Sequence, residues 1–183
     1  MRLYRQTVED FALYTGKELD DAEMDALRTA AGEMSAKMRA VRIVSASSIS
    51  KRDLEQRLVQ KGEDPEQAKE AVQWMSDLHL VDDRQTAEQV VARCVSKGYG
   101  LARAKQALYE KKIPKEYWND VLADYPDQTE KIVDFLRSRL GDEPSEKDTK
   151  RAIDALLRRG HSWSEIRQAL KEVAQDADEF REE

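Results

Sequence analysis

Residues 98–110, GYGLARAKQALYE, decide the fold because the chain repeats their pattern. Residues 160–172, GHSWSEIRQALKE, share the first glycine, the Gln-Ala-Leu triplet and the last glutamate at the same places. Residues 48–60, SISKRDLEQRLVQ, keep the same two apolar positions. These positions are spaced i, i+4, so each segment is predicted to be a helix with one apolar face. The aligned apolar residues are Leu54, Leu58, Ala104, Leu108, Ile166 and Leu170.

The similarity continues on both sides of the repeated helix. Apolar residues upstream align in all three copies, which predicts a helix before each repeated helix. Residues 64–75 and 114–125 align downstream and predict a helix after it. The repeating unit is therefore three helices in about 50 residues, with an extra helix expected between the second and third copies. The aligned upstream residues are Val41, Val44, Val91, Cys94, Ile153 and Leu156.

Three short helices bury too little apolar surface to be stable alone, so neighbouring units are expected to share a core. We therefore predict an all-α fold of tandem three-helix repeats that form an elongated, curved array. Ser50, Gly100 and Ser162 stand at the starts of the repeated helices and suit N-caps. The expected divisions are an acidic, partly helical N-terminal segment (1–33), three-helix repeat 1 (34–80), three-helix repeat 2 (81–125), an inserted helix and linker (126–145), and three-helix repeat 3 with an acidic C-terminal tail (146–183).

The composition excludes several classes of protein. Only seven of the 183 residues are glycine and four are proline, which favours helix over sheet. No stretch approaches the length of an apolar membrane span, and the N-terminus lacks the apolar core of a secretory signal. The single cysteine cannot form an internal disulfide, and two histidines with one cysteine make no zinc set. We therefore expect a soluble cytoplasmic protein.

No group of residues has the spacing of a catalytic site. His79 and His161 are isolated in the sequence, and His161 is expected to be partly packed rather than catalytic. Asp82 and Asp83 suit a helix N-cap better than a metal site. Cys94 falls on an apolar stripe, which predicts a core position. We expect no enzyme activity, no cofactor and no metal.

Charge is the remaining signal. Between residues 97 and 115, six cations accompany one acid, although the whole chain has a net charge of −6. A second cationic cluster occurs at the equivalent place in the third copy. Such clusters can bind DNA phosphate or an acidic protein surface, or they can be solvated helix faces, and the residues alone leave these alternatives open. The candidate binding residues are Lys97, Arg103, Lys105, Lys111, Lys112, Lys150, Arg151, Arg158 and Arg159.

Four segments, in this order, resemble the RecX family of regulatory proteins. They are SKRDLEQRLVQKG (50–62), LHLVDD (78–83), KGYGLARAKQAL (97–108) and LLRRGHSWSEIRQAL (156–170). GKELDDAEMDAL (16–27) also resembles the N-terminal part of longer bacterial members, so the resemblance covers residues 15–173.

The chain departs from the usual family pattern at four positions. His79 and Lys112 stand where glycine is usual. Thr86 stands where an aromatic residue is common, and Ala107 stands where glutamate often precedes the leucine. These departures concern the detailed contacts, while the order and spacing of the segments still match the family.

The resemblance implies a function. Members of the family are tandem three-helix repeat proteins that modulate the RecA recombinase in homologous recombination, DNA repair and the SOS response. They bind along the helical groove of the RecA–DNA filament and usually inhibit strand exchange and ATP hydrolysis, without a cofactor or catalytic residue. The RecA filament is therefore the implied partner, with single- or double-stranded DNA phosphates as further contacts of the nine cations, and we expect a monomer. The alternatives are a DNA-binding protein that acts without RecA, and a helical-repeat scaffold for an acidic protein partner.

Overall fold

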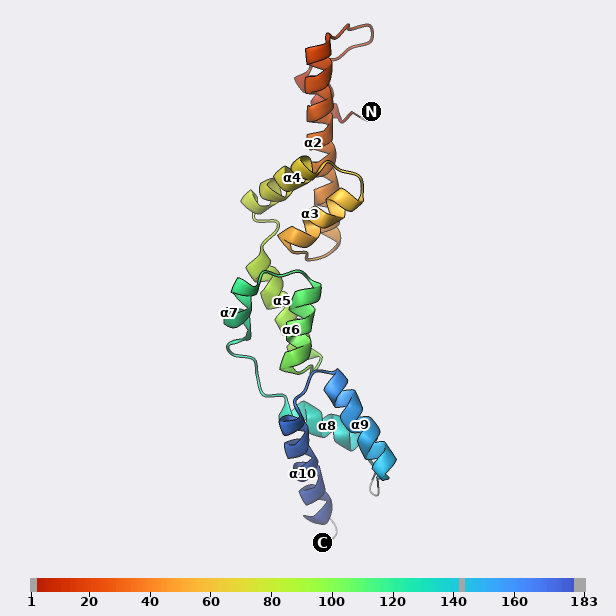
Figure 1. Ribbon diagram of the computed structural model, residues 1–183, viewed down its shortest axis with the longest axis vertical. Helices are drawn as coiled ribbons and strands as arrows, with labels where there is room; N and C mark the ends of the chain where they lie inside the picture. Colours follow the sequence, from red (N-terminus) through yellow and green to blue (C-terminus); the bar gives the residue numbers. More distant parts are fainter. Residues whose placement is uncertain (1–2, 142–143, 180–183) are drawn as a thin grey trace. The chain divides into compact units, whose positions relative to one another are not determined.

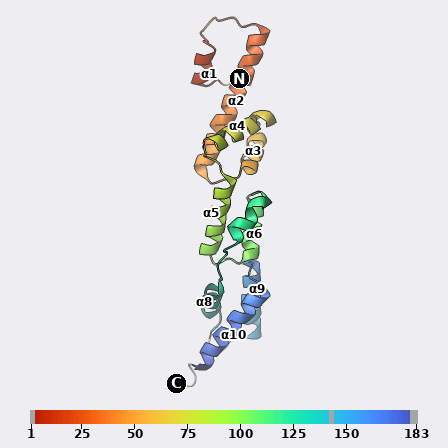
Figure 2. The ribbon, with the colours of Figure 1, turned by 90° about the vertical axis from the view of Figure 1, so that its left-hand side faces the viewer.

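The computed structural model describes residues 3–141 and 144–179, and every regular element in these ranges is helical. The predicted all-α class is therefore confirmed. The chain divides into two compact units, residues 1–86 and 87–183, and each is described by itself. Figures 1 and 2 show the helices from two directions. None of the helices within the described ranges is long and apolar enough to cross a membrane.

In unit 1, the long helix α2 supports the two helices that follow it. Both α3 and α4 pack against α2 and against each other (Figure 1). Their apolar faces form one cluster, in which Ala36, Ala40, Leu54, Leu58 and Met75 are almost completely buried. The elements are α1 (Arg5–Asp10), α2 (Asp21–Ala46), α3 (Lys51–Gln60), α4 (Pro65–Asp77) and the first turn of α5 (Asp83–Ser96).

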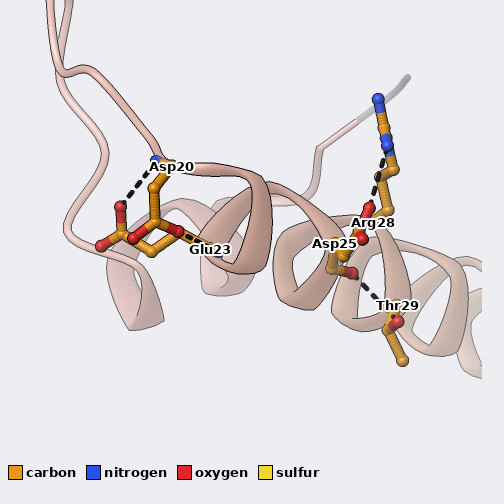
Figure 3. Close-up of polar contacts among 5 residues, drawn as sticks. All are labelled: Asp20, Glu23, Asp25, Arg28 and Thr29. Atoms are coloured by element: carbon orange, nitrogen blue, oxygen red, sulfur yellow. Dashed lines mark hydrogen bonds and ion pairs between the residues drawn. The ribbon is translucent and has the colours of Figure 1, made fainter.

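The acidic residues before and within α2 have structural roles at its start. Asp20 accepts a hydrogen bond from the Glu23 backbone N–H at 2.7 Å, and the Glu23 carboxylate accepts one from the Asp20 N–H at 3.1 Å (Figure 3). This capping box supplies acceptors for N–H groups that have no partner within the helix. Beyond it, Arg28 pairs with the Asp25 carboxylate at 3.0 Å, and the Thr29 hydroxyl donates to the Asp25 carbonyl at 3.0 Å.

Two further caps of unit 1 follow the sequence signals. The Ser50 hydroxyl accepts a hydrogen bond from the Asp53 N–H at 3.2 Å, which confirms the N-cap predicted for α3. Asp82 caps α5 by accepting from the backbone N–H three residues later, at 3.0 Å. Asp83 is buried and accepts from the Lys51 N–H at 2.8 Å, so it joins the start of α5 to the start of α3.

Within the described ranges, no cluster of three or more metal-ligating side chains occurs.

In unit 2, the helices form two hydrophobic clusters. The first joins α5 to α6 and to the short helices after it, with Ala87, Leu108 and Ile113 buried inside. The second joins α8, α9 and α10. The elements after α5 are α6 (Leu101–Glu110), the 3-10 helix η1 (Lys115–Tyr117), α7 (Trp118–Leu122), α8 (Thr129–Arg139), α9 (Glu146–Arg158) and α10 (Trp163–Glu179).

The repeated apolar faces lie in the interior of both units, as predicted. Leu170 is the least buried of the aligned residues, and it packs against the second cluster of unit 2. The other five, Leu54, Leu58, Ala104, Leu108 and Ile166, are each 0% exposed.

The helix predicted between the second and third copies, α8, packs into the core of unit 2. Its Ile132 and Leu136 belong to the same cluster as Leu156 of α9 and Ile166 of α10. The described part of residues 146–183 holds two helices, so α8 supplies the third helix of this bundle. The limits of the sequence divisions stay predictions, and residues 180–183 of the acidic tail lie outside the described residues.

Candidate functional site

Two glycines bring two of the repeated segments into contact within unit 2. The Gly100 N–H donates to the Arg159 carbonyl at 2.9 Å, and the Ala102 N–H donates to the Gly160 carbonyl at 3.2 Å. A Cβ atom on Gly100 would collide with the Gly160 carbonyl, and one on Gly160 would collide with the backbone nitrogen of Arg103. Glycine is therefore required at both positions by close backbone contact. We call residues 97–103 and 158–161, which meet here, the glycine junction.

His161 packs into the glycine junction. Its side chain is buried, and Nε2 donates a hydrogen bond to the Gly98 carbonyl at 3.0 Å. Because a carbonyl only accepts, Nε2 carries the proton of the neutral ring. Burial lowers the pKa of His161, and the hydrogen bond to Gly98 opposes this shift in part. The histidine is therefore a packed structural residue, as predicted.

The junction brings together four of the nine predicted cations. A further cation, Lys131 of α8, donates through Nζ to the Val95 carbonyl, and its side chain lies against Gly98. The sequence comparison does not identify Lys131, because it treats the 126–145 segment as an insert. The four predicted cations at the junction are Lys97, Arg103, Arg158 and Arg159.

The other five predicted cations lie away from the junction. Lys111 and Lys112 follow the C-terminal end of α6, which is one helix length, roughly 15 Å, from its glycine end. Lys105 is exposed in the middle of α6. Lys150 and Arg151 lie near the start of α9 and line different hollows. The nine cations are therefore distributed over the junction, α6 and α9, and Arg151 shares a hollow with Arg158 and Arg159 of the junction.

Glu110 neutralises part of the charge of the 97–115 segment. Its Oε1 lies 3.0 Å from Arg103 Nη1 and 3.2 Å from the Gln106 amide nitrogen. These hydrogen bonds lower the pKa of Glu110, and the bond to Glu110 raises the pKa of Arg103. Lys97 and Lys105 have no carboxylate within ion-pair distance among the described residues, so their charges are available to a partner.

Four arginines line a groove formed by α8 and α9. The groove has a volume of about 440 Å³. The guanidinium carbons of Arg159 and Arg139 lie 4.6 Å and 5.6 Å from the centroid of the Phe135 ring. Such cation–π contacts hold the guanidinium groups in place. We call this the arginine groove, and the lining residues that matter below are Phe135, Arg139, Asp148, Arg151, Arg158 and Arg159.

Asp148 is the acid on the lining of the arginine groove, and it is already engaged. Its Oδ2 accepts from the Ser145 hydroxyl at 2.6 Å, and its Oδ1 lies 3.6 Å from Arg151 Nη1. Within the described ranges, Arg139, Arg158 and Arg159 have no carboxylate at ion-pair distance. The groove therefore keeps a positive charge that an anionic ligand can neutralise.

Sequence reasoning missed two residues of the arginine groove, Phe135 and Arg139. Both lie in the segment that the repeat alignment leaves out. Their i, i+4 spacing on an amphipathic helix is the signal that could have found them, because residues at this spacing lie side by side.

Two other polar side chains of unit 2 are used in packing. Cys94 is buried as predicted, and burial raises the pKa of its thiol. The Tyr125 hydroxyl donates to the Tyr99 carbonyl at 2.6 Å, and burial raises its pKa to about 12. Both shifts keep these groups protonated, which opposes a nucleophilic role. Neither group therefore offers a nucleophile, and the charged groups available to a ligand are the arginines and lysines described above.

The chain is similar to curated proteins named Regulatory protein RecX. The protein of that name from Xanthomonas axonopodis pv. citri is 30% identical over 136 residues, which cover 73% of this chain and 84% of that protein. The one from Chlorobaculum tepidum is 30% identical over 137 residues, which cover 73% of this chain and 85% of that protein. No family model matches the chain.

Two solved structures share the fold of the chain. A crystal structure of a regulatory protein RecX superposes with a TM-score of 0.70 at 21% identity, covering 92% of this chain and 86% of that chain. The crystal structure of RecX from Lactobacillus salivarius gives a TM-score of 0.68 at 22% identity, covering 80% of this chain and 99% of that chain. The helical fold of the chain is therefore one that has been observed in crystals.

Proposed function

The chain belongs to the RecX family of regulatory proteins, and we propose that it binds the RecA–DNA filament and lowers the recombinase and ATPase activity of RecA. The glycine junction is the observation that supports this proposal, since it holds two cation-bearing repeated segments in direct backbone contact. A filament of protein on DNA presents carboxylates and phosphates, and cations on a rigid backbone frame suit such a partner.

We assign the filament contacts to the predicted cations that remain exposed. Arg103 and Arg151 contribute less, because Glu110 and Asp148 already pair with their guanidinium groups. In this proposal the protein acts by binding, as a cytoplasmic monomer without a catalytic group of its own. The exposed cations are Lys97, Lys105, Lys150, Arg151 and Arg158.

The proposal is tested by titrating purified RecA on single-stranded DNA with the full chain and measuring the rate of ATP hydrolysis. We expect the rate to fall as the chain approaches a stoichiometric amount relative to RecA. An unchanged rate at that amount would reject the proposed function.

A charge-reversal pair locates the surface. Lys97→Glu with Lys105→Glu places two acids at exposed positions of unit 2, and we expect about tenfold more protein to be needed for the same inhibition. The matched control is Arg52→Glu with Lys69→Glu, which changes the charge equally at exposed positions of unit 1. Circular dichroism checks that both variants keep their helices. Equal inhibition by the two variants would place the interface away from Lys97 and Lys105.

A further inference from the structure

We propose that the arginine groove binds the phosphodiester backbone of nucleic acid. The inference deepens the proposed function and rests on it in one respect, namely that a RecA–DNA filament would supply the nucleic acid. It assigns the DNA contact to α8 and α9, including Arg139, which the repeated segments do not contain.

The type of cation in the groove suits phosphate. The positive groups on the groove lining are all arginines, and a guanidinium presents its N–H groups as a planar fork that matches two phosphate oxygens. Three of them, Arg139, Arg158 and Arg159, have no competing carboxylate among the described residues. A ligand therefore does not have to displace an existing ion pair at these three positions.

Two of the groove arginines are held in place before a ligand binds. Arg139 and Arg159 both lie over the ring of Phe135, at 5.6 Å and 4.6 Å from its centroid. Stacking uses the face of a guanidinium and leaves the N–H donors at its edge for a ligand. Because the side chains are already held in place, less conformational freedom is lost when a ligand binds.

The spacing of the arginines favours a nucleic acid over an acidic peptide. Arg151 and Arg158 lie seven residues apart on α9, so their Cα atoms are roughly 10 Å apart along the helix. A nucleic-acid strand carries one phosphate per nucleotide on a continuous backbone, so successive phosphates of one strand can span this distance. Phosphates on a continuous backbone can therefore meet several arginines at once, whereas acidic side chains must each be ordered separately.

The test measures binding of the full chain to a fluorescein-labelled oligothymidylate by fluorescence anisotropy, without RecA, over a series of salt concentrations. The groove variant is Arg139→Gln with Arg158→Gln, because both side chains are exposed and glutamine favours helix. The matched control is Arg167→Gln with Lys171→Gln, which removes the same charge from exposed positions of α10 outside the groove.

We expect the groove variant to bind about tenfold more weakly at about 0.1 M salt. The negative slope of the log association constant against log salt should become shallower by about 1.4, because two phosphate contacts are lost. The control should bind within about twofold of the unmodified chain. If the glutamine substitutions reduce the helix content, the variant Arg139→Lys with Arg158→Lys is used instead. We expect it to bind about threefold more weakly than the unmodified chain, because lysine lacks the guanidinium fork.

Three results would overturn the inference. The first is equal weakening in the groove variant and the control, which would indicate overall charge alone. The second is unchanged binding in the groove variant. The third is binding of a poly-glutamate peptide as tightly as the oligothymidylate with the same sensitivity to the groove variant, which would assign the groove to an acidic protein.

The RecA ATPase titration separates this inference from the proposed function. A chain that binds DNA through the groove and leaves the ATPase rate unchanged would support the inference and reject the proposed function. If the unmodified chain inhibits RecA but the groove variant binds DNA as tightly as the unmodified chain, the proposed function is supported and the inference is rejected.

Discussion

His79 and Lys112 have φ values of +55° and +56°, in the left-handed region that residues with a Cβ atom rarely adopt. They are the two positions at which the family resembled by this sequence usually has glycine. Each lies in the turn that follows a helix, α4 in one case and α6 in the other. The backbone of the chain at these two turns therefore has the conformation that favours glycine, although each residue carries a side chain.

Replacing His79 by glycine should stabilise the protein. A side chain in the left-handed region costs roughly 1–2 kcal/mol, and the greater freedom of glycine in the unfolded chain offsets part of this gain. We expect His79→Gly to raise the free energy of unfolding of unit 1 by about 0.5–1 kcal/mol, measured by urea denaturation. His79→Ala, which keeps the Cβ atom, should leave the stability nearly unchanged. A lower stability for the glycine variant would contradict this account of the turn.

The buried His161 should make the stability of unit 2 depend on pH. Burial lowers its pKa in the folded state, whereas in the unfolded chain the pKa returns to about 6.5. The unfolded state then binds more protons, so the free energy of unfolding falls as the pH drops below about 6.5, and this loss ends below the folded pKa. Urea midpoints between neutral and mildly acidic pH measure the effect. The His161→Gln variant should lose this pH dependence, and the His79→Gly variant should retain it. If the free energy of unfolding depends on pH equally in the unmodified chain and both variants, groups other than His161 are responsible.

Among the elements, the helices of the repeat could be predicted because their signals are local. An i, i+4 pair such as Leu54 and Leu58 sets an apolar face within one segment. Ser162 could be predicted as a cap for the same reason, and its hydroxyl accepts from the Glu165 N–H at 3.2 Å. The nine candidate cations were found by counting charge, which gives no information on their separation in space.

The contacts between distant segments could not be predicted in this way. The glycine junction depends on backbone groups of Gly100 and Gly160 that meet across about sixty residues of sequence. The arginine groove depends on α8 packing beside α9, and the alignment that revealed the repeat set α8 aside. Periodicity describes each helix by itself and does not say which helix it packs against.

Substituting Gly160 should disrupt the backbone contact between the start of α6 and the turn that follows α9. Alanine there would adopt φ near +86° and would collide with the backbone of Arg103, so we expect a loss of about 2–4 kcal/mol in the free energy of unfolding of unit 2. Gly62→Ala is the control, because Gly62 has φ +90° with open space around it, and the cost there should be about 1 kcal/mol. Urea denaturation measures both. If the two variants lose similar amounts of unfolding free energy, the close backbone contact at the junction adds nothing to the cost of placing a side chain at positive φ.

At the scale of the whole molecule, the two compact units should lose structure separately. Leu136 of α8 is fully buried in the cluster that α8 forms with α9 and α10. We therefore expect Leu136→Ala to lower the free energy of unfolding of unit 2 by about 2–5 kcal/mol. Hydrogen exchange should then show reduced amide protection in α8–α10 and unchanged protection in α2–α4. Leu54→Ala in unit 1 should give the opposite pattern. Equal loss of protection in both units for either variant would show that they unfold as one.

The long separation of the two halves of the glycine junction also sets the order in which the protein can form during synthesis. The core of unit 1 is complete once Val81 has emerged from the ribosome, and domains can fold while the rest of the chain is being made. The Gly100 N–H must wait until Arg159 has emerged. The junction proposed to engage RecA therefore assembles only after unit 1, and a nascent or prematurely terminated chain can hold a folded unit 1 while lacking the means to engage the filament.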